Sequence, residues 1–131
     1  MWHNGGTKNN KPTKPVAWIA SSLKDLKEMP EDVRCFFGVA LFMAQAGEKH
    51  PDAKPLKGFS GAGVLEIVED HDGDTYRAVY TVRFADVVYV LHAFQKKSKT
   101  GIATPQAEID KIKARLKMAE ELHRVRGGNK T

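Results

Sequence analysis

The chain lacks several features that would narrow its function at once. Its 131 residues include one cysteine, so an internal disulfide and a zinc site built from several cysteines are excluded. No apolar run approaches the ~18 residues that a membrane-spanning helix needs, and the first residues lack the apolar stretch of a signal peptide. The histidines share no spacing typical of metal ligands. We therefore expect a cytoplasmic protein with no membrane contact, no metal and no cofactor.

The composition is that of a folded, basic domain. Apolar residues make up 41% of the chain and charged residues 28%, which permits a buried core under a solvated surface. Lysine and arginine number 21 against 16 acidic residues, a formal charge of +5. This excess favours an anionic partner, nucleic acid first, although a solvated basic surface gives the same total.

The chain divides into one domain with two weakly structured ends. Residues 1–15 contain one large apolar side chain, Trp2, among Gly, Asn, Lys, Thr and Pro, so we expect a flexible arm there. Residues 127–131 read GGNKT and are expected to fray. The remaining residues, 16–126, form the expected domain.

Hydrophobic periodicity predicts the order β-α-α-β-β-β-α, which is an α+β fold with helices packed on an antiparallel sheet. The strands are predicted at residues 16–20, 64–69, 76–84 and 87–95, and the first two helices at 22–29 and 30–47. Cys35 lies among apolar residues of the second helix and is expected in the core. Thr104 is expected to cap the last helix, which has one apolar face and a basic remainder. That remainder comprises Lys111, Lys113, Arg115 and Lys117.

Alternation along the strands assigns side chains to two sheet faces. With two-residue turns at Asp72-Gly73 and Ala85-Asp86, Val79 lies opposite both Glu66 and His92. The face expected to lie under the helical hairpin carries Leu65, Ile67, Tyr76, Ala78, Tyr80, Val82, Phe84, Val87, Tyr89 and Leu91. The other face, expected to be polar, carries Glu66, Arg77, Val79, Arg83, Val90, His92, Phe94 and Lys96.

Basic residues gather near this second face. The segment QKKSKTG, which follows the last strand, contains Lys96, Lys97 and Lys99 and no acidic residue. Lys54 and Lys57 lie in the loop before the three consecutive strands that begin at residue 64. Cations beside one histidine and one glutamate suit a phosphodiester, because they neutralise phosphate charge and stabilise the pentacovalent transition state. Purely structural interpretations of these residues are open as well: an ion pair between Glu66 and Arg77, a half-buried His92 and a solvated lysine loop.

Three stretches carry a family resemblance. The stretches AKPLKG (53–58), VLEIVEDHDGDTYRAVYTVRF (64–84) and VYVLHAFQKKSKTGIATP (88–105) resemble the phage-derived, HigB-like branch of the RelE/ParE toxins of bacterial type II toxin–antitoxin systems. The likeness runs from about residue 15 to residue 116. It implies a RelE-like fold and a ribosome-dependent, metal-independent mRNA endonuclease that arrests translation.

The resemblance also implies roles for individual residues. Catalysis would fall to Arg77, His92, Lys96 and Lys97. RNA binding would fall to Lys54, Lys57, Arg83 and Lys99, with Glu66 as support for Arg77. RelE-type relatives often have a tyrosine near the chain end, whereas this chain has none after Tyr89, so the general base is unassigned.

The implied partners are an antitoxin of the helix-turn-helix type, the ribosome and mRNA, with operator DNA bound only through the antitoxin complex. Two alternatives remain at this point. A ParE-like protein of the same fold would inhibit DNA gyrase by binding, without catalysis. A non-catalytic, phage-derived protein would bind nucleic acid through its basic surface alone.

Overall fold

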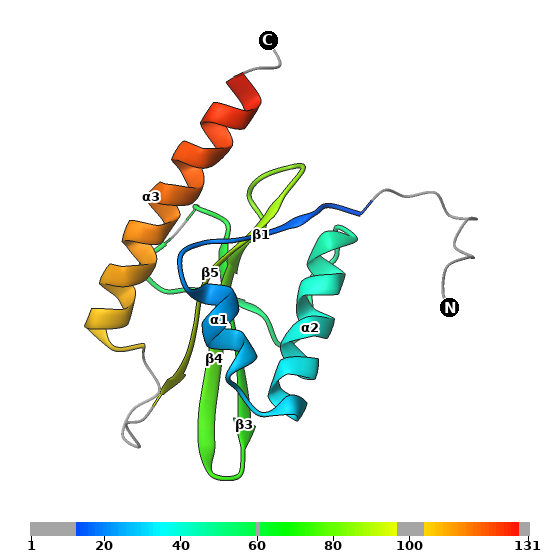
Figure 1. Ribbon diagram of the computed structural model, residues 1–131, viewed down its shortest axis with the longest axis vertical. Helices are drawn as coiled ribbons and strands as arrows, with labels where there is room; N and C mark the ends of the chain where they lie inside the picture. The colour runs from blue at the N-terminus through cyan, green and yellow to red at the C-terminus, as the bar shows by residue number, and fades with distance from the viewer. Residues whose placement is uncertain (1–12, 60, 97–103, 129–131) are drawn as a thin grey trace, which may run out of the picture.

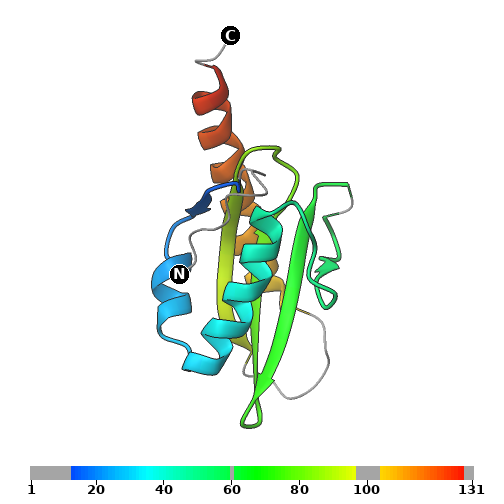
Figure 2. The ribbon, with the colours of Figure 1, turned by 90° about the vertical axis from the view of Figure 1, so that its right-hand side faces the viewer.

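An antiparallel meander forms the centre of the fold. The computed structural model describes residues 13–59, 61–96 and 104–128, and the meander consists of β3 (Val64–His71), β4 (Asp74–Thr81) and β5 (Val88–Lys96). Helices α1 (Ser22–Lys27) and α2 (Glu31–Gln45) lie on one side of the sheet and α3 (Gln106–Gly128) on the other (Figures 1 and 2). The predicted α+β fold is confirmed.

Two short strands extend the meander into a five-stranded sheet of order β1-β5-β4-β3-β2. Strand β1 (Val16–Trp18) runs parallel to β5, and β2 (Lys54–Pro55) pairs antiparallel with β3. The sequence did not indicate β2, because two residues that include a proline show no alternation. Its register places Lys54 directly opposite Glu66.

The first predicted turn is confirmed and the second is wrong. Asp72 and Gly73 both have positive φ, 53° and 84°, as a two-residue hairpin turn between paired residues 71 and 74 requires. The turn at Ala85-Asp86 does not form, because β4 ends at Thr81 and β5 begins at Val88. Val79 lies opposite Glu66 and His92 as predicted.

A β-bulge in β5 changes which face several residues occupy. Val79 pairs with His92 but Tyr80 pairs with Val90, which leaves Leu91 as an extra residue. In consequence Val87, Tyr89 and Leu91 pack with α3 rather than with α1 and α2, and Val90 does the reverse. Residues 87–91 are all apolar, so the sequence contains no alternation that could reveal the bulge.

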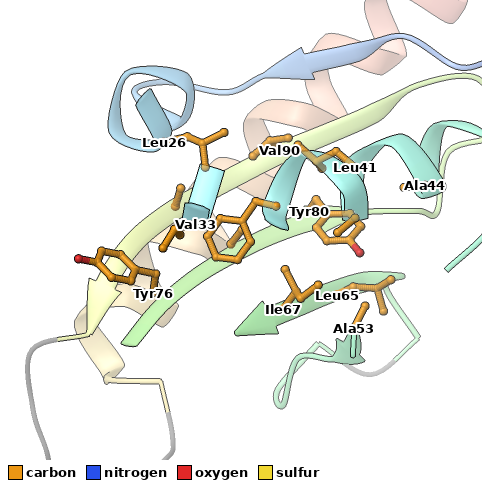
Figure 3. Packing of buried hydrophobic residues seen from close by; sticks show 14 of the residues in the cluster. Leu26, Val33, Leu41, Ala44, Ala53, Leu65, Ile67, Tyr76, Tyr80 and Val90 are labelled. Carbon is orange, nitrogen blue, oxygen red and sulfur yellow. The ribbon is translucent and has the colours of Figure 1, made fainter. Parts of the chain in front are cut away.

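Each face of the sheet has its own core. One core joins the sheet to α1 and α2 and includes Val33, Tyr80 and Ile67 (Figure 3). The other joins the sheet to α3 and includes Val79 and Ile112. The face predicted to be polar is therefore covered by a helix, and its charged residues lie at the margin of an apolar cluster.

Several local predictions need correction. Cys35 is exposed rather than buried, because it lies on the side of α2 opposite the buried stripe, close to exposed Val39 and Phe42. Ser22 is the first residue of α1, and its hydroxyl donates to the Val90 carbonyl. Within the expected arm, Lys14 exchanges hydrogen bonds with Gln45, whereas residues 1–12 lie outside the described part.

Helix α3 continues to Gly128, two residues past the predicted domain boundary at 126, and residues 129–131 lie outside the described part. Its C-terminal end reaches beyond the sheet (Figure 1). Among the residues that the structure describes, no helix is both long and apolar enough to cross a membrane.

Candidate functional site

A pocket of about 600 Å³ opens between the segment around β2 and the first turns of α3. Three cationic side chains line it: Lys54 from β2, Lys57 from the loop that follows, and Lys113 from α3. Leu56 and Ile109 supply apolar surface. Its volume lies within the range of sites that bind small molecules, about 300–1,000 Å³.

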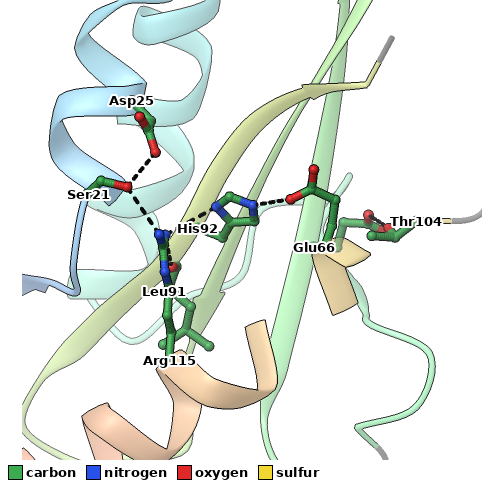
Figure 4. A network of polar contacts seen from close by, with 8 residues as sticks. Ser21, Asp25, Glu66, Leu91, His92, Thr104 and Arg115 are labelled. Atoms are coloured by element: carbon green, nitrogen blue, oxygen red, sulfur yellow. Dashed lines mark hydrogen bonds and ion pairs between the residues drawn. The ribbon is translucent and has the colours of Figure 1, made fainter. Parts of the chain in front are cut away.

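One wall of the pocket holds a partly buried ion pair. Arg77 of β4 donates from Nη1 to Oε2 of Glu66 at 2.6 Å. Thr104 donates its hydroxyl to the same oxygen at 2.8 Å, and lies 3.4 Å from the same Arg77 nitrogen. Figure 4 shows Thr104 beside Glu66. The side chains of Arg77 and Glu66 are only 6% and 16% exposed, so each charge needs the other.

This ion pair leaves the pocket with a positive charge. Among the described residues that line it, Glu66 is the one carboxylate, and Arg77 already compensates that carboxylate. The lysines of the pocket are exposed, and they come from two separate segments of the chain, residues 54–57 and α3. An anionic ligand that enters the pocket would therefore meet net positive charge on more than one side.

His92 lies next to the pocket in a separate polar network. Its Nε2 is 2.5 Å from Oε1 of Glu108, and its Nδ1 is 3.2 Å from Nη1 of Arg115. A guanidinium only donates, so Nδ1 accepts and Nε2 carries the proton that binds Glu108. Both ring nitrogens of His92 are thus engaged inside the protein, and the ring is 3% exposed.

Arg115 connects this network to the rest of the fold. It donates to the Leu91 carbonyl at 3.0 Å and to the Ser21 hydroxyl at 3.1 Å, and Ser21 in turn donates to Asp25 at 2.8 Å. Figure 4 shows Arg115 between Ser21 and His92. One side chain of α3 therefore joins β5 to the start of α1.

Burial lowers the pKa of His92, and the nearby cations of Arg115 and Lys111 lower it further, while Glu108 opposes them. The imidazole is accordingly neutral at pH 7. The unfolded chain binds a proton more readily than the native chain once the pH falls below about 6.5, the ordinary histidine value. The protein therefore loses stability as the pH falls below that value.

This pH dependence can be tested with His92→Gln. A glutamine amide can donate to Glu108 and accept from Arg115 without titrating. Urea unfolding at pH 7.5, 6.5 and 5.5 should show a decline in stability for the wild-type chain that is smaller in the variant. Equal declines in both proteins would show that His92 does not cause the effect.

The structure brings some of the predicted site residues together and separates others. Lys54, Lys57 and Glu66 line the pocket, and Arg77 contacts Glu66. Lys96 is buried at the end of β5, opposite Thr75. Arg83 is not among the lining residues and instead pairs with Glu120 of α3 at 2.6 Å. The remaining two predicted residues, Lys97 and Lys99, lie outside the described residues.

Sequence reasoning missed the contribution of α3. Gln106, Ile109 and Lys113 recur at helical spacing and line the pocket, but in the sequence the lysine was one of several on a basic helix surface. Arg115 was assigned to that surface, although it is 9% exposed. Thr104 binds Glu66 with its hydroxyl, a contact that the predicted helix cap did not include.

Over residues 13–59, 61–96 and 104–128, no group of three or more His, Cys, Asp or Glu side chains is placed to hold a metal ion. In a comparison with protein families, the sequence model described as phage-derived protein Gp49-like matches residues 24–117, which is more than half of the chain. The matched region includes the residues that line the pocket, together with His92, Glu108 and Arg115. Comparison with curated proteins gives no significant match.

Proposed function

The chain belongs to the phage-derived Gp49-like family, and on that premise we propose that it is the toxin of a type II toxin–antitoxin system, an endonuclease that cuts mRNA on the ribosome. The observation that carries the proposal is the lysine-lined pocket beside the Arg77–Glu66 pair. The resemblance of residues 53–58, 64–84 and 88–105 to HigB-like toxins supports it independently.

The chemistry that such a pocket favours is cleavage by the RNA itself. The 2′-oxygen attacks the adjacent phosphorus, the bond to the 5′-oxygen breaks, and the products carry a 2′,3′-cyclic phosphate and a 5′-hydroxyl. Cations accelerate this step because the pentacovalent phosphorus gains negative charge. In the proposal Lys54 and Lys57 bind a phosphate that flanks the scissile one, and Arg77 stabilises the transition state with the aid of Lys96 and Lys97.

We assign His92 a positioning role rather than that of a base. In its present tautomer the proton on Nε2 is donated to Glu108 and the lone pair on Nδ1 is taken by Arg115. The imidazole therefore orients Glu108 and, through it, the first turn of α3 that borders the pocket.

An antitoxin is the proposed partner in the resting cell, with the ribosome and mRNA as the targets. The pocket suggests how neutralisation would work. An acidic segment of an antitoxin that covers the three lysines would exclude RNA, because the same charges would attract both ligands.

The proposal can be tested by regulated expression of Lys54→Ala/Lys57→Ala in a bacterium, with reporter mRNA mapped by primer extension. The wild-type chain should arrest growth and cut translated messages, and the double variant should reduce cutting at least about tenfold, because two phosphate contacts are lost. Lys24→Ala/Lys27→Ala removes the same charge from exposed positions on α1 and should behave as wild type. Intact mRNA under wild-type expression would contradict the proposal.

A binding-only function is the second candidate, and burial favours it. Arg77, His92 and Lys96 are each less than 10% exposed, on a face that α3 covers. A gyrase inhibitor of the ParE type needs no accessible catalytic group. Growth arrest with intact mRNA and an induced DNA-damage response would identify this alternative.

A further inference from the structure

The pocket combines a charged surface with an apolar surface, and each would bind a different part of one ligand. Lys54, Lys57 and Lys113 provide charge, whereas the buried Leu56 and the half-buried Ile109 provide an apolar lining. An inorganic anion would use only the first kind. A ligand with an anionic group attached to a flat apolar body would use both.

Polar groups at the α3 side add the means to recognise the edge of such a body. The exposed Gln106 amide donates to Asp110 at 2.8 Å, a surface hydrogen bond that it can exchange for one to a ligand. Thr104 lies on the same side, with its hydroxyl on Glu66. Unstacked or flipped bases are recognised by hydrogen bonds along their edges and by packing between aromatic or apolar side chains.

We infer that the pocket holds one unstacked nucleotide of the RNA: the base lies against Leu56 and Ile109, and the phosphate is bound by Lys113 together with Lys54 and Lys57. This inference rests on the proposed function, because it names the part of the RNA that enters the site. It makes Lys113 a substrate-binding residue and places Gln106 where base preference would be set.

The first test compares ligands. Ribose 5-phosphate and the four nucleoside monophosphates are titrated into the full-length chain, and backbone amide shifts are followed by NMR. At least one nucleotide should bind about tenfold more tightly than ribose 5-phosphate, with shifts concentrated at residues 54–58 and 106–113. Equal affinities would overturn the inference and leave a simple anion site.

The second test compares variants. Lys113→Ala should weaken binding of a 2′-O-methyl trinucleotide several-fold and lower the slope of log K against log salt by about 0.7. Lys117→Ala removes a lysine of the same helix that does not line the pocket. It should change binding only as much as the loss of another charge distant from the pocket would. Equal effects of the two substitutions would contradict the assignment. Ile109→Ala should weaken nucleotide binding and leave ribose 5-phosphate binding unchanged.

An acidic peptide serves as the competing ligand. If a glutamate-rich hexapeptide binds at residues 54–58 and nucleotides do not, the pocket is a protein-contact site and the inference fails. These measurements require neither ribosomes nor growth arrest. Nucleotide binding without mRNA cleavage would therefore refute the proposed function alone, and cleavage without nucleotide binding would refute this inference alone.

Discussion

Substitution of Arg77 by methionine is expected to abolish mRNA cleavage and, at the same time, to destabilise the fold. Removal of a cation that stabilises charge in the transition state costs about 10²–10³ in rate. The loss of stability has a separate cause. Glu66, 16% exposed, keeps its charge and loses the partner 2.6 Å away, which costs roughly 3 kcal/mol for an ion pair of this burial.

A second substitution separates the two effects. In Glu66→Gln/Arg77→Met neither of the two positions carries a charge, and the glutamine oxygen can still accept from Thr104. We expect urea unfolding to return to within about 1 kcal/mol of the wild-type stability, because a buried ion pair contributes little net free energy. Primer extension should still show no cleavage. Restored cleavage in the double variant would mean that Arg77 acts only in folding. The single variant Glu66→Gln is the control for the loss of the Glu66 carboxylate.

A loss of stability of similar size is expected from Arg115→Met. This residue donates to Leu91, contacts His92 and donates to Ser21, and so connects α3 with β5 and the start of α1. Methionine retains much of the apolar part of the arginine side chain. It leaves the buried carbonyl of Leu91 and Nδ1 of His92 without the guanidinium that donates to them. We expect a loss of about 3 kcal/mol in the free energy of unfolding.

A matched control lies on the same helix. Arg124 pairs with Glu121 at the surface, so Arg124→Met should leave the urea midpoint unchanged. Nitrogen-15 shifts of His92 provide a second measurement, because the substitution removes the donor to Nδ1 while Glu108 still accepts from Nε2. Equal urea midpoints for Arg115→Met and the wild-type chain would show that the network does not hold α3 in place.

Local signals predicted most of the secondary structure. The Asp72-Gly73 pair determined the turn and thereby the register of β3 against β4, which placed Arg77 close to Glu66. The apolar stripe of α2 and the position of α3 also followed from periodicity. The bulge in β5 did not, because five consecutive apolar residues fit either face equally well.

The sequence predicted the part of the site that depends on strand register, but not the part that α3 contributes. Lys113 and Arg115 are two positions apart on α3, yet one lines the pocket and the other is buried against β5. The sequence shows both as cations on a basic helix. Their different roles depend on how α3 docks on the sheet, and that docking is set by side chains distant in sequence, among them Val79 and Tyr89.

The most direct test of the proposed function uses purified chain and translating ribosomes programmed with a defined mRNA. We predict a cut within the translated codons, a 2′,3′-cyclic phosphate at the new 3′ end, and loss of cleavage when the nucleotide that provides the attacking oxygen is changed to 2′-deoxy. Cleavage that persists with the 2′-deoxy nucleotide would contradict attack by the RNA's own hydroxyl. No cleavage of either message would contradict the endonuclease itself.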